Sequence, residues 1–239
     1  MAVAFEISAP IAMFRRPYTT TSSVSFPLPP PTAVAGLLSS IVGLANGCNE
    51  RAHHAKFWEA IKGTKIAISI LNPVAWFAGT LNFWNLKEPQ KNPHIRVKHQ
   101  FVKKPRYRIY VQNGIERKLH NYLKNETFIY TPYLGVAYAI AEITYLDDFE
   151  AKAVKTGTSI ALSSVLPVTN QNFTLDILSS KSIFKDILPF RLDSERNLCE
   201  TIETLYSPSQ NHKICLKSWE GLDVTTYRNE YIAWFPAWL

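Results

Sequence analysis

The sequence predicts an α+β fold: an RRM-like or ferredoxin-like antiparallel sheet with an inserted basic β-hairpin, followed by a smaller β-rich C-terminal part. Three observations predict it. The first 155 residues show the order strand, helix, strand, strand, helix, strand. A strongly cationic stretch within them alternates with period two. The rest is rich in Ser and Thr with short apolar runs. We therefore expect an RRM-like domain at 1–155 and a β-rich domain at 156–239.

The first strand and the first helix are separated by a basic loop and a proline-rich arm. Val3, Phe5 and Ile7 alternate with small or polar residues, as in a strand. The arm, from 27 to 31, must be extended because four of its residues are proline. Thr32 is the expected N-cap of a helix whose apolar residues recur at helical spacing until Asn46-Gly47 ends it. Gly36 weakens this helix, which suggests close approach by a neighbouring backbone or a ligand.

The next elements are a short helix and two strands. The segment 51–61 is amphipathic and directs Ala55, Trp58 and Ile61 inward. Residues 64–71 and 74–84 follow as strands, separated by Asn72-Pro73.

Positive charge is concentrated in one segment. The formal net charge of the chain is +7, yet the stretch from Lys87 to Lys118 holds ten Lys or Arg against Glu88 and Glu116. That stretch therefore carries +8 and leaves −1 for the remainder. A local cationic element of this kind implies a polyanionic partner.

The basic segment contains two alternating runs, 95–101 and 106–112, on either side of Lys103-Lys104-Pro105. We predict that they pair as a ribbon across this turn. Lysines that merely protect a sheet edge would also produce basic strands. We favour a nucleic-acid surface because eight excess charges repel one another without a counter-charge, and because Tyr and Phe are interleaved with them.

The later elements have weaker patterns. Residues 116–124 predict a short helix, and a strand is expected near 139–146. In the C-terminal part, short apolar runs around residues 159–166, 212–219 and 231–236 are typical of strands.

Recognisable catalytic chemistry is sparse. The phosphate-loop, dinucleotide, zinc-protease and nucleophile-elbow motifs do not occur, the three cysteines have no metal-binding spacing, and no cofactor or metal is expected. Asp147-Asp148 is interpreted as a solvated turn. Lys98-His99 could supply a metal-free ribonuclease, with His99 as general base and Lys98 stabilising the phosphorane. Adjacent strand residues point to opposite faces, which favours packing of His99 and a phosphate contact for Lys98.

Four segments carry a resemblance to a known family: the run from Phe14 to Leu38, the strand 106–111, the stretch 130–143 and Trp234-Phe235-Pro236. Together they resemble the Cas-five family of CRISPR-associated proteins, within the RAMP superfamily, and are most similar to its type I-B members. The resemblance implies a crRNA-binding subunit of a type I Cascade complex that holds the 5′ handle of the guide RNA. It also implies that the basic ribbon is a hairpin thumb, at about 92–112, which is gripped at the start of the backbone filament.

The same resemblance implies the partners of the chain, and the sequence itself indicates its compartment. It implies contacts with the Cascade backbone subunits and the large subunit, and proximity to target DNA beside the PAM through the complex. A homo-oligomer is not expected. The chain lacks an apparent targeting or membrane segment, so a cytoplasmic location without membrane contact is expected.

Candidate RNA contacts lie in the first loop and on the basic ribbon. The following side chains are the candidates: Arg15, Arg16, Tyr18, Arg96, Lys98, His99, Lys103, Lys104, Arg106, Tyr107 and Arg108. No catalytic or metal-binding residue is assigned.

Three functions remain open at this point. The favoured one is a non-catalytic RNA-binding module. The second is an endoribonuclease using His99 and Lys98, because the type I-C branch of the family processes precursor crRNA with a Tyr, a Lys and a His. The third is an architectural subunit whose C-terminal aromatic residues dock a partner.

Overall fold

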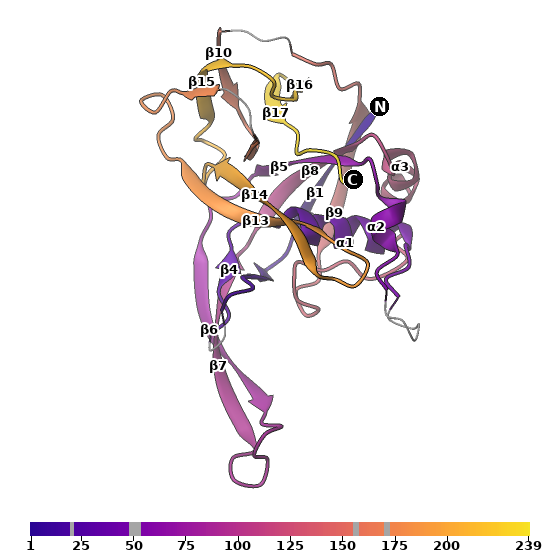
Figure 1. Cartoon of the computed structure of the whole chain (residues 1–239), viewed down its shortest axis with the longest axis vertical. Helices are drawn as coiled ribbons and strands as arrows, with labels where there is room; N and C mark the ends of the chain where they lie inside the picture. The colour runs from indigo at the N-terminus through magenta and orange to yellow at the C-terminus, as the bar shows by residue number, and fades with distance from the viewer. Residues whose placement is uncertain (20–21, 48–53, 155–157, 170–172) are drawn as a thin grey trace.

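The computed structural model describes residues 1–19, 22–47, 54–154, 158–169 and 173–239. Its central element is a four-stranded antiparallel sheet in the order β5-β8-β1-β9 (Figure 1). The strands are β1 (Ala2–Ser8), β5 (Lys65–Ile70), β8 (Arg106–Gln112) and β9 (Glu142–Phe149). With the helices α1 (Pro31–Val42) and α3 (Glu116–Lys124) between them, this is the ferredoxin-like order. The predicted fold class is confirmed.

Both faces of this sheet are covered. Val3, Phe5 and Ile7 of β1 pack into the main core together with α1 and α3. Ala2 and Ala4 face the other way and pack against Tyr227, Ile232 and Trp234 of the C-terminal part. Because both faces are buried, β1 is buried over nearly its whole length rather than on alternate residues.

Helix α1 begins and ends at residues other than those predicted. Pro30 is the N-cap and Pro31 occupies the first helical position, where a missing N–H costs nothing, so Thr32 is not the cap. The helix stops at Val42 because Gly43 adopts a left-handed conformation with φ of 72°, and not at Asn46-Gly47. α2 (Phe57–Ala60) is shorter than the predicted helix, and residues 51–53 of that prediction lie outside the described residues. The inward direction of Ala55, Trp58 and Ile61 is confirmed by their burial.

A long hairpin leaves the body next to the central sheet (Figure 1). It consists of β6 (Trp76–Trp84) and β7 (His94–Lys103), and β2 (Ile11–Ala12) joins β7 at the base. The pairing predicted from the sequence is wrong, because β7 pairs with β6 and β8 lies between β5 and β1. The hairpin therefore spans residues 76–103 instead of 92–112.

The strands after residue 157 form two further sheets. One has the order β12 (Phe173–Leu175), β15 (Ile214–Trp219), β10 (Thr158–Leu162), β17 (Glu230–Ala233) and β16 (Val224–Tyr227). The other has the order β11 (Leu166–Val168), β14 (Leu198–Tyr206) and β13 (Phe184–Leu192), and β13 packs against α1. A two-stranded sheet of β3 (Phe14–Arg15) and β4 (Ser25–Phe26) completes the structure. The division into domains at residue 155 stays a prediction. Side chains from both sides of that boundary share the main core.

The C-terminal aromatic residues are buried. Trp234, Phe235 and Trp238 are at most 3% exposed, and the indole N–H of Trp238 donates to the Phe190 carbonyl over 3.2 Å. Among residues 234–239 only Leu239 is exposed. The predicted terminal dock of exposed aromatic side chains is therefore wrong.

Candidate nucleic-acid interface

The hairpin β6–β7 has two chemically different faces. Directly paired residues of an antiparallel ladder share a face, and successive pairs alternate between faces. The pairs Thr80–Lys98 and Asn82–Arg96 lie on one face, which we call the basic face. The intervening pairs form the apolar face: Phe77–Phe101, Gly79–His99, Leu81–Val97 and Phe83–Ile95.

The cations of the basic face, Arg96 and Lys98, are exposed to solvent. Among the described residues no carboxylate lies within ion-pair distance of either. Near the tip, Trp84 is 69% exposed and its ring lies 4.7 Å from that of His94. A row of exposed cations that ends in an exposed aromatic pair can hold phosphates and stack bases.

The apolar face carries aromatic side chains that cover Gly79. His99 stacks on Phe101 at 5.8 Å and lies 5.7 Å from Phe83, and a Cβ at Gly79 would approach the rings of Phe77 and Phe101. Farther toward the tip this face is open, with Phe83 43% and Ile95 41% exposed. Exposed apolar surface on a projecting element is typical of a protein-docking site.

Lys98 and His99 point to opposite faces of the hairpin. His99 is 7% exposed, and its Nδ1 lies 3.0 Å from the carbonyl oxygen of Val97. Lys98 is exposed on the basic face. A general base and a phosphorane-stabilising cation must reach the same phosphate, and these two side chains do not.

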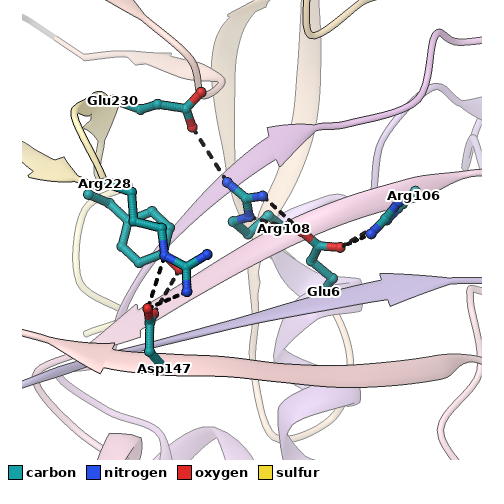
Figure 2. Close-up of polar contacts among 7 residues, drawn as sticks. Glu6, Arg106, Arg108, Asp147, Arg228 and Glu230 are labelled. Atoms are coloured by element: carbon teal, nitrogen blue, oxygen red, sulfur yellow. Dashed lines mark hydrogen bonds and ion pairs between the residues drawn. The ribbon is translucent and has the colours of Figure 1, made fainter.

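Two candidate arginines of β8 share one carboxylate, as Figure 2 shows. Glu6 accepts from Arg106 Nε at 2.9 Å and from Arg108 Nη2 at 2.8 Å, and Arg108 also lies 3.5 Å from Glu230. Burial opposes ionisation of Glu6, but the hydrogen bonds from Arg108 and Arg106 hold its pKa below the ordinary range. These arginines therefore contribute less free positive charge than the sequence indicated, and their RNA contacts stay a prediction.

Tyr107 faces the core rather than the solvent. Its side chain is 1% exposed, its hydroxyl donates to the Pro27 carbonyl at 2.7 Å, and burial raises its pKa. It therefore ties the proline-rich arm to β8. Tyr110, on the opposite face of β8, is also buried, against Tyr227 and Trp234. The sheet surface on which an RRM stacks bases is thus occupied by the C-terminal part in this chain.

The first-loop candidates lie beside the base of the hairpin. Ser23, which follows them in the same loop, is hydrogen-bonded to the backbone of Lys98 and Gln100 in β7. Its N–H donates to the Lys98 carbonyl and its carbonyl accepts from Gln100. Arg16 is bound by Asp186 and by the Tyr18 hydroxyl. Arg15 donates to the Thr19 carbonyl but remains exposed, and Tyr18 is 71% exposed.

Lys103 and Lys104 lie where the chain passes from the hairpin into the central sheet. Lys103 ends β7, and Lys104 has a positive φ of 46°. Both are exposed. By the alternation of β7, Lys103 lies on the side of His99 and Phe101 and not on the basic face.

Sequence reasoning missed the contribution of β6. Thr80 and Asn82 share the basic face, and Trp84 ends it, but β6 carries no charge that would have marked it. The sequence predicts a strand at 74–84 but does not indicate the strand with which it pairs. Asp147 and Asp148 were also misjudged: they lie in β9, where Asp147 accepts from Tyr227 and Arg228 (Figure 2) and Asp148 accepts from Tyr145.

Within the described residues no cluster of His, Cys, Asp and Glu side chains could hold a metal ion. No helix in the same part of the chain is both long enough and apolar enough to cross a membrane.

Comparison with protein families identifies the chain. Residues 2–146 match the family model described as CRISPR-associated protein (Cas_Cas5). The chain belongs to the Cas5 family. The match covers β1, β5, β8, the first part of β9 and the whole hairpin, whereas β10 to β17 lie outside it. A search of curated proteins finds no significant match.

Solved structures of CRISPR proteins are similar to this chain in fold but distant in sequence. A chain of a CRISPR RNA-guided surveillance complex is 10% identical with a TM-score of 0.57, and the match covers 91% of each chain. A CRISPR protein from Archaeoglobus fulgidus is 12% identical, also with a TM-score of 0.57, over 98% of this chain and 99% of that one. At these identities the likeness establishes the fold.

Proposed function

We propose that this member of the Cas5 family is a non-catalytic, crRNA-binding subunit of a type I Cascade complex in the cytoplasm. It holds the 5′ handle of the guide RNA and caps the backbone filament next to the large subunit. One observation carries the proposal: the projecting hairpin has exposed cations on one face, without a carboxylate of the described residues in ion-pair distance, and exposed apolar side chains on the other.

The basic face suits an RNA backbone. Lys98 and Arg96 lie on neighbouring same-face positions of one strand, about 7 Å apart along it. This spacing is close to that of successive phosphates in an extended single strand. Contacts with phosphates fix the path of an RNA without selecting its bases.

The apolar face suits a protein partner. Phe83 and Ile95 are directly paired and both substantially exposed, so a subunit that covers them would remove apolar area from water. We assign this face to a Cascade backbone subunit. The large subunit and target DNA beside the PAM are further expected neighbours, and a single copy of the chain takes part.

A non-catalytic role is supported by the separation of Lys98 and His99. The alternative, a metal-free endoribonuclease, is tested by incubating the purified chain with its own CRISPR repeat RNA in EDTA. We expect uncleaved RNA. A product that disappears in His99→Ala would establish the ribonuclease instead.

RNA binding is tested by reversing charge on the basic face. Arg96→Glu with Lys98→Glu should weaken guide-RNA binding and reduce the slope of log K against log salt by about 1.4, at 0.7 for each lost phosphate contact. Lys62→Glu with Lys181→Glu is the matched control, since both lysines are exposed and lie outside the hairpin. Equal salt slopes for the two double variants would refute the assignment.

A further inference from the structure

The strand β6 forms an open edge of the hairpin sheet. It is the outermost strand in the order β2-β7-β6, and no strand of the described residues other than β7 pairs with it. The hairpin projects from the body (Figure 1), and seven of the nine residues of β6 are exposed. A row of backbone N–H and C=O groups along β6 can therefore pair with a further strand.

This edge lacks the features by which proteins block edge pairing. Lysines, prolines and bulges on an edge strand keep another chain from pairing with it. The sequence of β6, WFAGTLNFW, contains no charged residue and no proline, and its register with β7 runs through all nine residues without a bulge. The cations of the hairpin strands lie instead on β7, among them Arg96 and Lys98. β6 thus has the composition of a strand that accepts a partner strand.

The sequence of β6 is complementary to an antiparallel copy of itself. When two copies are aligned with Thr80 at the centre, aromatic residues face aromatic residues at both ends. The resulting pairs are Trp76–Trp84, Phe77–Phe83, Ala78–Asn82, Gly79–Leu81 and Thr80 with itself. Aromatic cross-strand pairs stabilise sheets. A shift by one residue would set opposite faces against each other, and a shift by two would lose the aromatic pairs.

This alignment also covers apolar surface. Phe77 and Phe83 are 49% and 43% exposed, and they would lie side by side across the two copies on the apolar face. Leu81 of the other copy would lie against Gly79, which has no side chain of its own. Contact between these residues removes apolar area from water in both copies.

Charge favours pairing through β6 over pairing through β7. Pairing through β7 would bring the cations of two copies together, whereas pairing through β6 places the two β7 strands outside, roughly 14 Å apart at three strand spacings. This distance exceeds the Debye length of about 8 Å at physiological salt, so the repulsion is largely screened. The paired strands would form about eight to ten backbone hydrogen bonds, as many as a typical protein interface has.

We infer that the free chain forms a symmetric dimer in which the β6 strands of two copies pair antiparallel about Thr80. The interface is isologous, because the same strand supplies both of its surfaces. The inference concerns the chain outside its complex and does not depend on RNA binding. A backbone subunit that covers Phe83 must displace the second copy, which leaves a single copy in the complex.

The first test measures which positions of β6 meet in solution. Single cysteines are placed on exposed positions of β6 in the full-length chain, with the three native cysteines changed to Ser, and disulfide formation is followed under mild oxidation. Thr80→Cys should form a covalent dimer, because directly opposite residues have Cα atoms about 4.5–5.5 Å apart, within disulfide range. Asn82→Cys is the matched control and should stay monomeric, since its two copies lie roughly 14 Å apart along the ladder. Ala78→Cys mixed with Asn82→Cys should cross-link one variant to the other.

Sedimentation velocity supplies a second measurement without any cross-link. Between about 1 and 100 μM the wild type should convert from monomer to dimer, as expected for an interface of small area. Thr80→Lys opposes two like charges at the symmetry centre and should weaken dimerisation about fivefold. Leu178→Lys adds the same charge at a position outside the hairpin that is 93% exposed, and it should behave like the wild type.

The alternative occupant of this edge is a strand of a different protein. A wild type that stays monomeric over the whole concentration range would refute the dimer, as would equal cross-linking of Thr80→Cys and Asn82→Cys. If the wild type is monomeric and Thr80→Lys no longer co-purifies with a backbone subunit, the edge belongs to a strand of that subunit.

Discussion

Arg16 and Asp186, separated by 170 residues in the sequence, are joined by paired hydrogen bonds between guanidinium and carboxylate. The side chains are only 19% and 13% exposed, and the guanidinium also lies 4.3 Å above the ring of Phe26. Burial disfavours the charged form, but the hydrogen bond to Asp186 keeps the pKa of Arg16 above its ordinary value. The pair links the first loop to β13 of the C-terminal part.

We predict that this pair acts on stability. Asp186→Asn should lower the free energy of unfolding by about 2 kcal/mol, the range for a hydrogen bond to a charged group. A double-mutant cycle with Arg16→Gln, followed by denaturant unfolding, should give a coupling of about 1–3 kcal/mol. If Arg16→Gln instead weakens RNA binding and leaves stability unchanged, Arg16 is an RNA contact.

The Glu6 network predicts a pH dependence. The pKa of Glu6 is held below its ordinary value of 4.5. Its ionised form therefore stabilises the fold above about pH 4.5, and this contribution is lost as the pH falls through the folded-state pKa. Glu6→Gln should cost on the order of 3 kcal/mol at pH 7, because it leaves Arg108 with a weaker partner.

The measurement is denaturant unfolding of wild type and Glu6→Gln from pH 7 down to pH 3. The difference between them should shrink below pH 4.5. Glu142→Gln, which changes an exposed carboxylate on the neighbouring strand, should stay within about 0.5 kcal/mol of wild type. A difference between wild type and Glu6→Gln that does not vary with pH would contradict the network's role.

Tyr107→Phe isolates one hydrogen bond. The change keeps the buried ring but leaves the Pro27 carbonyl without its donor. We expect a loss of about 1–2 kcal/mol in the free energy of unfolding and unchanged guide-RNA affinity. Reduced RNA affinity in a protein of normal stability would show that Tyr107 contacts RNA after all.

The apolar face of the hairpin is predicted to bind a backbone subunit. Phe83→Ser with Ile95→Ser should leave the monomer folded and reduce co-purification with that subunit by at least about tenfold, as for a cluster of interface hot spots. Thr80→Ser with Asn82→Ser changes the alternate, basic face of β6 and serves as the control. Equal recovery of the partner with both variants would exclude docking on this face.

The hairpin shows what the sequence can and cannot predict. The strand at 95–101 is predicted from its own alternation, and the strand at 74–84 follows the break at Asn72-Pro73. The separation of Lys98 from His99 follows from the strand period of two. Strand partners depend on contacts between distant segments, which the local pattern does not contain. Lys103-Lys104-Pro105 has the composition of a tight turn, yet the chain uses it to enter the central sheet.

The candidate site was predicted only in part for a related reason. Local charge density marks Arg96 and Lys98 correctly as exposed cations, but it does not show that Glu6, a hundred residues earlier, lies between Arg106 and Arg108. Burial of Tyr107 depends likewise on the arm that crosses β8. The sequence therefore indicates surface contacts for residues of β8 that the fold instead uses for ion pairs and buried hydrogen bonds.

The alternation of the hairpin constrains how it can evolve. A single residue inserted into β6 would move every side chain beyond it to the opposite face and place Phe83 among the cations. Two inserted residues would lengthen the hairpin and preserve both surfaces. Hairpins of this kind should therefore differ among relatives by even numbers of residues per strand, and odd changes should coincide with a bulge that restores the pattern.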